Sequence, residues 1–229
     1  MRQSDSKVGR IVLLGAGGRT GRAVLEVAAR RGRAVTAVVR RAAAPPPRTG
    51  VRGDVPQDGP EDGQRGVRHV VVADPGARGA LDAVIGPLDA VVSVLGPTGR
   101  GPSTACTDVV GSALASMART GARRLIVVSA HGAAESRDRS PYCLALWAVE
   151  AHKMRDKESM EELVRASGVE WTVVRPPALK DGAPTGRYRT GEDLRITLTS
   201  SITRADLADF LVHEAAAGAF VHRTPRIAA

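Results

Sequence analysis

Short apolar runs alternate with amphipathic segments along most of the chain, in the order typical of strands and helices that follow one another. Six strands are predicted at runs rich in Val, Leu, Ile and Ala, namely residues 11–14, 34–39, 67–72, 88–96, 124–129 and 170–175. Helices are predicted over residues 20–31, 104–120, 141–150, 157–166 and 204–217, with a further helix starting near 75–78 and a seventh strand at 194–198. Ser103 is the expected N-cap of the helix at 104–120, and Thr203 followed by Asp206 forms a capping box before the helix at 204–217. Because strands and helices alternate and the strands are apolar throughout, the sequence predicts an α/β fold with a doubly wound parallel sheet.

Loops rich in proline and glycine interrupt this pattern without dividing the chain. A chain of 229 residues with 43% hydrophobic content can form one α/β core, so residues 1–229 are expected to be a single domain. Residues 42–66 contain three consecutive prolines and few apolar side chains, which predicts an exposed inserted loop. Residues 175–200 follow the last strong strand and are expected to form a flap in a small C-terminal region on the substrate side.

The most informative motif is the glycine-rich turn that follows the first strand. Its first glycine lets the chain reverse, the middle glycines let the backbone approach a pyrophosphate, and the last lets helix and strand pack closely. The N-terminal N–H groups of the helix then face the phosphates. Glycines also make ordinary structural turns, but a strand before the triplet and a helix after it are the context that dinucleotide binding requires. The predicted cofactor-binding residues of this turn are Gly15, Gly17, Gly18, Arg19, Thr20 and Gly21.

The end of the second strand bears on the choice of cofactor. Proteins that bind NAD usually place an acidic residue there for the ribose hydroxyls, whereas an arginine accommodates the 2′-phosphate of NADP. Here the strand ends on Arg40 and Arg41, with no acidic residue, and Arg19 in the glycine turn is a second candidate for the same phosphate. The alternative is that these are solvated surface arginines, but the missing acid favours NADP.

Further cofactor contacts are expected where the other strands end, because ligands of open α/β sheets bind at the carboxyl ends of the strands. Asp74 either faces the adenine side or caps the helix expected after it. The remaining candidates follow the fourth, fifth and sixth strands and are Leu95, Gly96, Pro97, Ser129, Pro176, Pro177 and Leu179.

Three side chains are candidates for the catalytic chemistry. Ser129 ranks first because a hydroxyl at a strand end can hydrogen-bond a substrate oxygen and stabilise developing negative charge. His131 ranks second, as a proton donor if its ring faces the cleft or otherwise as a surface imidazole. Tyr142 ranks third, either as an acid or as a core or lid aromatic.

Tyr142 ranks last because of what surrounds it in the sequence. It lies thirteen residues after Ser129, a spacing similar to that of the Tyr–Lys short-chain reductases, in which a lysine four residues after the tyrosine lowers the phenol pKa. Leu146 occupies that position here, and Lys153 and Lys157 are too distant along a helix to replace it. A phenol without such help is a poor proton shuttle at neutral pH.

Composition excludes several classes of function. The net charge is +9, yet 29 of the 33 basic residues are scattered arginines and only 3% of residues are aromatic, so no nucleic-acid partner is expected. Cys106 and Cys143 lack the spacing of a metal or disulfide framework, so no metal is expected. A short polar N-terminus predicts neither a signal peptide nor a membrane span, and hence a cytoplasmic protein. A small-molecule substrate and a monomer or weak homodimer complete the expected partners.

The sequence resembles the atypical short-chain dehydrogenase/reductases, namely the NmrA-like group and especially the biliverdin reductase B (flavin reductase) type. This resemblance implies a Rossmann-like fold, NADP binding and reduction of flavins, quinones or carbonyl compounds. Ala178 stands where the flavin-reductase type carries a histidine, and residues 42–66 replace a connection that is usually short. The segments that carry the resemblance are residues 15–21, 35–40, 89–96, 125–129, 167–177, 185–188 and 202–208.

Three functions therefore stay open. The leading one is an NADPH-dependent oxidoreductase that transfers a hydride to a small planar or carbonyl substrate of flavin, quinone or ketone type. The second is an NADP-sensing regulator of the NmrA-like kind that binds the cofactor without turnover. The third is a non-redox lyase, isomerase or cyclase on the same fold, because a fold does not fix a function.

Overall fold

A six-stranded sheet forms the centre of the molecule. The computed structural model describes residues 8–40, 66–96, 99 and 101–229. All neighbouring strands of the sheet are parallel, in the order β3-β2-β1-β4-β5-β6, which confirms the predicted Rossmann-like α/β class. The strands are β1 (Ile11–Leu14), β2 (Val35–Val39), β3 (Val67–Val71), β4 (Ala90–Ser93), β5 (Arg124–Val128) and β6 (Glu170–Val174).

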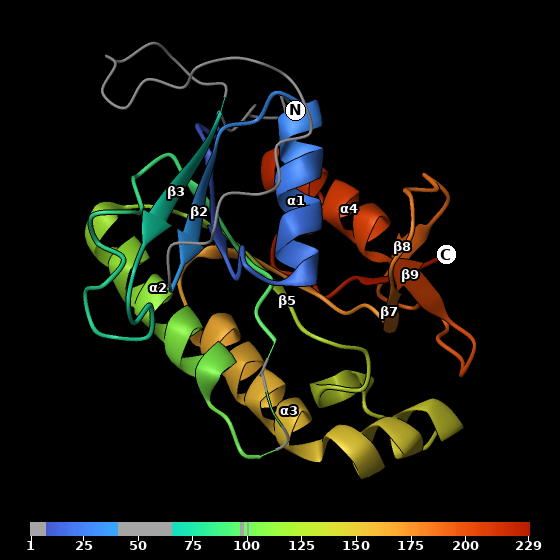
Figure 1. Ribbon diagram of the computed structural model, residues 1–229. Coiled ribbons are helices and arrows are strands. Elements are labelled where there is room, and N and C mark those ends of the chain that lie inside the picture. The colour runs from blue at the N-terminus through green and yellow to red at the C-terminus, as the bar shows by residue number, and fades with distance from the viewer. Residues whose placement is uncertain (1–7, 41–65, 97–98, 100) are drawn as a thin grey trace, which may run out of the picture.

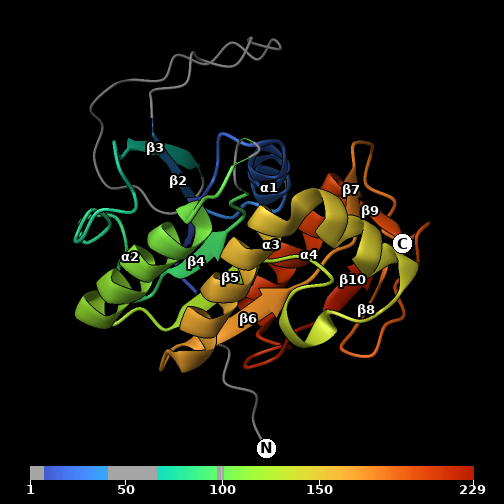
Figure 2. The same cartoon turned by 90° about the horizontal axis from the view of Figure 1, so that it is seen from below.

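Helices cover both faces of this sheet (Figures 1 and 2). Alternate side chains of β1 point to opposite faces, as the period of a strand requires. Ile11 and Leu13 pack in one apolar cluster with α1 and α4, whereas Val12 and Leu14 pack in a second cluster with α2 and α3. The helices are α1 (Arg19–Arg30), α2 (Ala105–Thr120), α3 (Pro141–Ala166) and α4 (Arg204–Ala217).

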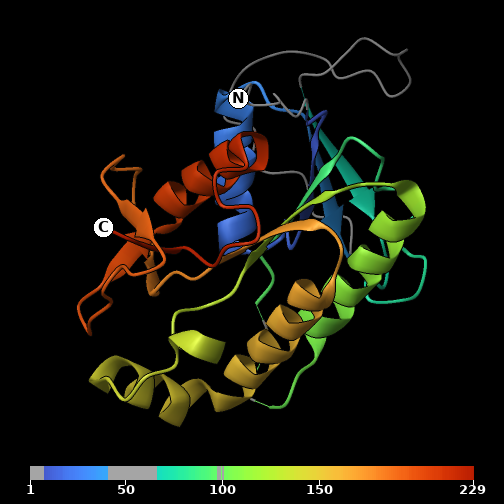
Figure 3. The ribbon, with the colours of Figure 1, turned by 180° about the vertical axis from the view of Figure 1, so that it is seen from behind.

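Two small two-stranded sheets form a region beside α4, seen at one side of the molecule in Figures 1 and 3. Strand β7 (Ala178–Lys180) pairs in parallel with β9 (Ser201–Thr203), and β8 (Arg189–Gly191) pairs antiparallel with β10 (Arg226–Ala228). None of β7, β8 and β10 follows from an apolar run, because each is only three residues long and two of them are largely exposed. No helix in the described part of the chain is both long and apolar enough to span a bilayer.

Two expectations from the sequence are wrong. Residues after Pro75 form a series of turns instead of a helix, with Gly79 at φ +76°, although Leu81 is fully buried there. Residues 194–198 form no strand, and the chain instead pairs on either side of them.

The helices expected at 141–150 and 157–166 are both present within α3. Glu150 has non-helical backbone angles, φ −118° and ψ 20°, so the first helix ends where expected and a kink separates it from the second. The second helix begins several residues earlier than expected, because the residues before 157 contain no helix breaker and bury Met154.

The N-terminus of α4 is capped by a neighbouring side chain, whereas that of α2 is not. At α4 the capping box is present, since the Asp206 N–H donates to Thr203 Oγ1 at 3.0 Å. The α2 helix begins one residue later than expected, and its N-cap residue makes no side-chain cap. Its second and third N–H groups, those of Cys106 and Thr107, donate instead to the carboxylate of Asp156 on α3, at 3.0 Å each. A distant carboxylate therefore stabilises this helix end.

The glycine turn after β1 fixes how closely α1 packs on the sheet. Gly15 has φ +89°, a conformation that favours glycine. A Cβ added at Gly21 would lie 2.3 Å from the Gly15 carbonyl oxygen and 2.7 Å from Ala16 Cα, and backbone atoms cannot move away as a flexible side chain can. A Cβ at Gly17 would meet nothing within 4 Å.

This contrast predicts opposite effects of two alanine substitutions in one turn. Gly21→Ala should destabilise the protein by about 1–3 kcal/mol or more, because the new methyl group forces α1 away from β1. Gly17→Ala should change the free energy of unfolding by less than about 0.5 kcal/mol, because the site is open and exposed. Urea denaturation of both variants measures this, and equal losses would contradict the packing argument.

Candidate functional site

The order of the sheet creates a crevice at its carboxyl edge. The strand order reverses between β1 and β4, and ligands of open α/β sheets bind where this reversal occurs. The two strand ends approach closely there, because a Cβ added at Gly15 would lie 3.2 Å from the Leu95 backbone nitrogen. Gly15 and Leu95, which the sequence places at the cofactor, therefore lie side by side.

The glycine turn presents its backbone at one side of this crevice. The Gly18 N–H donates to the Gly15 carbonyl at 3.1 Å, and Gly17 is exposed. Arg19 and Thr20 are the first two residues of α1, whose first turn contains no acidic residue and whose N-cap, Gly18, makes no side-chain cap. The positive end of the α1 dipole is thus uncompensated by an acidic side chain of this turn, which fits a bound pyrophosphate.

Lys157 is a site residue that sequence reasoning missed. Its side chain, from α3, is buried, and its ammonium donates to the Leu95 carbonyl at 2.7 Å and to the Val128 carbonyl at 2.6 Å. It therefore joins the segment that follows β4 to the last residue of β5. Lys157 is distant from Tyr142 along α3, as the sequence predicts. Its contacts are instead with the chain at the ends of β4 and β5, which sequence spacing does not reveal.

Ser129 and His131 follow β5 directly and are buried, with 5% and 2% exposure. Their backbone N–H groups donate to the Val174 and Pro176 carbonyls, at 2.8 and 2.9 Å, which extends the pairing of β5 with the chain after β6. The Ser129 hydroxyl and both ring nitrogens of His131 have no hydrogen-bond partner among the described residues. Because buried polar atoms are normally satisfied, these three atoms mark a place where a ligand can supply partners.

Tyr142 lies next to His131, at the first turn of α3. The two ring centroids are 5.4 Å apart with an interplanar angle of 45°. Burial lowers the pKa of His131 to about 4, helped by the positive charges of Arg226 and Arg175, so the ring is neutral at pH 7. Burial also raises the pKa of Tyr142, which makes its phenol a weaker acid at neutral pH.

The remaining cofactor candidates lie at other strand ends. Arg40 is exposed directly after β2 and forms no ion pair with any residue that the structure describes. Asp74 is exposed and accepts a hydrogen bond from the Gly76 N–H at 3.0 Å, so it shapes a turn, and the helix it was expected to cap does not exist. Gly96 is exposed, whereas Arg41 and Pro97 lie outside the described residues, as does the inserted loop up to residue 65.

The segment after β6 is more tightly held than a free flap would be. Pro176 and Pro177 are buried, and the Pro176 carbonyl is already taken by the His131 N–H. Leu179 lies in β7 and packs against the cluster that contains α1 and α4. These positions restrict how far residues 176–179 can move toward a cofactor.

Two acidic residues fix the rest of this segment. The buried Asp206 carboxylate accepts the N–H groups of Thr185 and Gly186 at 2.8 and 2.9 Å, and these bonds outweigh the effect of burial and lower its pKa. Asp181 pairs with Arg19 of the glycine turn at 3.1 Å and with Arg204 of α4 at 2.7 Å. An exposed ion pair is weak, but this one links the predicted flap to the predicted phosphate site.

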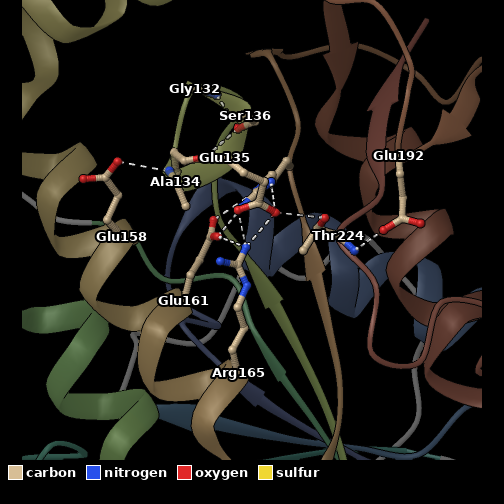
Figure 4. A network of polar contacts seen from close by, with 11 residues as sticks. Gly132, Ala134, Glu135, Ser136, Glu158, Glu161, Arg165, Glu192 and Thr224 are labelled. Carbon is tan, nitrogen blue, oxygen red and sulfur yellow. Dashed lines mark hydrogen bonds and ion pairs between the residues drawn. The ribbon is translucent and has the colours of Figure 1, made fainter. Parts of the chain in front are cut away.

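A buried arginine links the start of the flap to α3. Arg175, 1% exposed, donates to both oxygens of Glu135 at 2.8 and 2.9 Å and also to the Glu161 carboxylate. Arg165 contacts the same two carboxylates, as Figure 4 shows. Glu135 belongs to a short 3-10 helix, η1 (Ala134–Ser136), so this network joins η1, α3 and the end of β6. Arg175 is therefore a fixed residue and not part of a flap.

A surface groove of about 820 Å³ lies along α3 but contains none of the predicted site residues. Its walls are mostly charged, and it is lined by Ala134, Arg155, Glu158, Ser159, Glu162, Arg165 and Ala166. The orphaned polar atoms at the end of β5 locate the candidate site better than this groove does.

Comparisons with known proteins agree with the dinucleotide binding that the glycine turn predicts. A family model described as NAD(P)H-binding matches residues 15–217. Among solved structures, ChuY, an anaerobilin reductase from Escherichia coli O157:H7, is similar with a TM-score of 0.73 and 23% identity over 95% of this chain and 96% of that one. SP1627 of Streptococcus pneumoniae TIGR4, named as an NADH-flavin reductase, has a TM-score of 0.70 and 21% identity over 96% and 98%. A Bacillus halodurans protein named as an NAD-dependent epimerase/dehydratase has a TM-score of 0.71 and 21% identity over 96% and 93%.

The arginine network predicts a pH-dependent stability. Burial opposes ionisation of Glu135, but the hydrogen bonds from Arg175 and Arg165 outweigh it and lower the pKa from 4.5 to about 2. The stabilisation is therefore complete above about pH 4.5 and is lost as the pH falls toward about 2. The difference in Tm between wild type and Glu135→Gln should be constant above this window and shrink within it.

Thr120→Val provides the control, because the Thr120 hydroxyl donates to the Ser116 carbonyl at 3.0 Å and neither group titrates. Its Tm offset from wild type should stay nearly constant. An offset for Glu135→Gln that does not shrink in acid would contradict the assigned network.

Proposed function

The chain belongs to the NAD(P)H-binding family, and on that premise we propose that it is an NADPH-dependent reductase of a small planar or carbonyl substrate. The observation that carries the proposal is the buried Ser129 hydroxyl at the end of β5, which has no partner among the described residues. A hydroxyl in this position can donate to a substrate oxygen at the same sheet edge where the glycine turn holds the cofactor.

Different residues of the chain bind different parts of the cofactor. The glycine turn and the first turn of α1 hold the pyrophosphate through backbone N–H groups. Arg40 and Arg41 hold the 2′-phosphate, and Arg40 is better placed than Arg19, because Arg19 already pairs with Asp181. Lys157 holds the carbonyls of Leu95 and Val128 and so fixes the chain after β4, which forms one side of the crevice, against the end of β5. The cofactor, when bound, supplies the hydride.

On the substrate side, the roles follow from protonation. Ser129 donates its hydroxyl hydrogen to the substrate oxygen and stabilises the negative charge that develops there. Tyr142 keeps its proton at neutral pH and forms a wall of the site. His131 is the second candidate donor, through a ring N–H of the neutral imidazole.

Two aromatic rings on the segment that follows Ser129 support a planar substrate. The His131 and Tyr142 rings lie 5.4 Å apart, and conjugated substrates stack on aromatic rings. The names of the similar structures point the same way, because one is named as an NADH-flavin reductase and another as an anaerobilin reductase. A flavin, a quinone or an anaerobilin-like compound is therefore the first class to test, and ketones the second.

A non-redox reaction is the second candidate function, and the epimerase/dehydratase name of one similar structure favours it. NADPH oxidation at 340 nm separates the candidates. The protein should oxidise NADPH with at least one flavin, quinone, anaerobilin or ketone. Tight NADPH binding without oxidation by any acceptor would instead support a regulator or a non-redox enzyme.

The end of β2 predicts the choice of cofactor. NADPH should bind at least about ten times more tightly than NADH, a difference of about 1.4 kcal/mol, because a bidentate arginine–phosphate contact can supply that much. Arg40→Asp should abolish or invert this preference, whereas the charge-matched Arg33→Asp, exposed before β2, should leave it unchanged. Fluorescence titration measures both, and equal binding of the two cofactors by wild type would refute the role of Arg40.

The catalytic ranking predicts a difference between two conservative variants. Ser129→Ala should lower kcat by about ten- to a thousandfold, the upper end being the loss for an oxyanion donor. Tyr142→Phe should lower kcat by less than about tenfold, because its phenol does not transfer the proton. Both variants should bind NADPH as wild type does. An inactive Tyr142→Phe beside an active Ser129→Ala would reverse the assignment.

A further inference from the structure

Three metal-binding side chains from separate segments meet beside the start of α3. His131 follows β5, Asp138 lies between η1 and α3, and Cys143 lies in the first turn of α3. One donor atom from each of the three residues lies within 4.8 Å of the other two. The cluster therefore offers a nitrogen, an oxygen and a sulfur to one point.

The buried histidine shows that this cluster differs from an ordinary group of polar side chains. His131 is 2% exposed, and neither ring nitrogen has a partner among the described residues. The thiol of Cys143 is also buried, and its contact with the Ser136 carbonyl is long, at 3.8 Å. One Asp138 oxygen accepts the Ser140 N–H at 2.9 Å, and the Asp138 carboxylate also accepts a hydrogen bond from the Cys143 thiol, so these two side chains already lie together. Unsatisfied buried nitrogen is costly, and a ligand that accepts its lone pair removes that cost.

The backbone holds the cluster in place through Gly132. This residue has φ +97°, and a Cβ added there would lie 3.3 Å from Cys143 Sγ, so only a glycine lets the two segments approach this closely. The Gly132 N–H donates to Ser136 Oγ at 2.9 Å, and the Trp147 indole donates to the Gly132 carbonyl at 2.9 Å. His131 and Cys143 are therefore brought together before any ligand binds.

We propose that His131, Asp138 and Cys143 bind one divalent zinc ion, with a fourth position open to water or a substrate atom. Imidazole nitrogen, thiolate sulfur and carboxylate oxygen are the ligands that zinc prefers, and three protein ligands with one open position are typical of reactive zinc sites. Donors around tetrahedral zinc are about 3.4–3.6 Å apart, and the donor atoms here lie within 4.8 Å of one another, so zinc binding draws them together by up to about 1 Å. Binding replaces the Cys143 thiol proton, which passes to solvent.

The spacing of residues 131, 138 and 143 matches no common metal motif, so the pattern of the sequence does not predict this site. The proposal goes beyond the reductase function and does not depend on it. The ring nitrogen of His131 that binds zinc is not a donor, whereas the other ring N–H and the Ser129 hydroxyl stay available as hydrogen-bond donors at this strand end.

Titration of the full-length, chelator-treated protein with Zn²⁺, and in parallel with Co²⁺, tests the proposal without any turnover. Calorimetry should show one zinc per chain, and the cobalt form should show a thiolate-to-cobalt charge-transfer band with intense tetrahedral d–d bands. Cys143→Ala should abolish the charge-transfer band and weaken zinc binding by more than about 100-fold, since even outer-shell partners are worth about 10- to 100-fold. Cys106→Ala is the matched control, because Cys106 is an equally buried cysteine on α2, and it should keep both signals.

Asp138→Asn keeps the experiment informative if a buried variant fails to fold, because Asp138 is exposed. It should weaken zinc binding yet retain the charge-transfer band. The proposal is overturned if zinc does not bind with one-to-one stoichiometry, if the cobalt form lacks the thiolate band, or if neither Cys143→Ala nor Asp138→Asn lowers the affinity. NADPH binding, measured on the same samples, tests the reductase assignment separately.

Discussion

One buried ammonium group fixes the edge of the sheet at which the site lies. Lys157 donates to the Leu95 carbonyl after β4 and to the Val128 carbonyl at the end of β5, and both bonds are shorter than 2.8 Å. A hydrogen bond to a charged group contributes about 1.5–3 kcal/mol, and a buried charge that loses its partners costs more than the bond itself contributes. The distance between these two strand ends is therefore set by a side chain from α3 as well as by sheet pairing. Leu95 also lies beside Gly15 at the crevice, so this contact fixes the position of one side of the crevice.

The same helix holds the neighbouring segments. Asp156 caps α2, Glu161 binds Arg175 after β6, and the Glu158 carboxylate accepts the Ala134 N–H of η1 at 3.0 Å. These residues lie within two turns of α3, so one rigid element positions the loops after three strands and the start of α2. Burying so much charge on one helix is stable only because each group finds a partner. The kink at Glu150 gives the first part of α3, which carries Tyr142 and Cys143, a different direction from the part that carries these charged residues.

Local signals made the sheet, the glycine turn and the start of the last helix predictable. The six strands, the glycine turn and the capping box of α4 each depend on residues that are close in sequence, so apolar runs and glycine spacing suffice to find them. The contacts of Lys157 could not be found this way, because 62 residues separate it from Leu95 and its neighbours depend on how α3 packs. Asp156, Arg175 and the cluster of His131, Asp138 and Cys143 were missed for the same reason. A helix was predicted after Pro75, but this segment forms turns although Leu81 and Val84 are buried there. Gly79, with φ +76°, has a backbone conformation that a helix does not allow.

The same difference between local and distant contacts explains why membership of the NAD(P)H-binding family identifies the cofactor class but not the substrate. The glycine turn is built from backbone at a sheet edge, where a Cβ at Gly21 would lie 2.3 Å from the Gly15 carbonyl oxygen, so a short glycine pattern identifies it. Segments 131–143 and 178–191 are instead held by side-chain contacts such as those of Glu135 and Asp181, which no short pattern identifies. Solved structures that are similar to this chain with TM-scores of 0.70–0.73 and 21–23% identity therefore bear different names, those of a flavin reductase, an anaerobilin reductase and an epimerase/dehydratase. Ser129 follows a core strand and adjoins the segment that carries His131 and Tyr142. Under the proposed function, its hydroxyl donates to a substrate oxygen, and the residues around His131 and Tyr142 select the substrate.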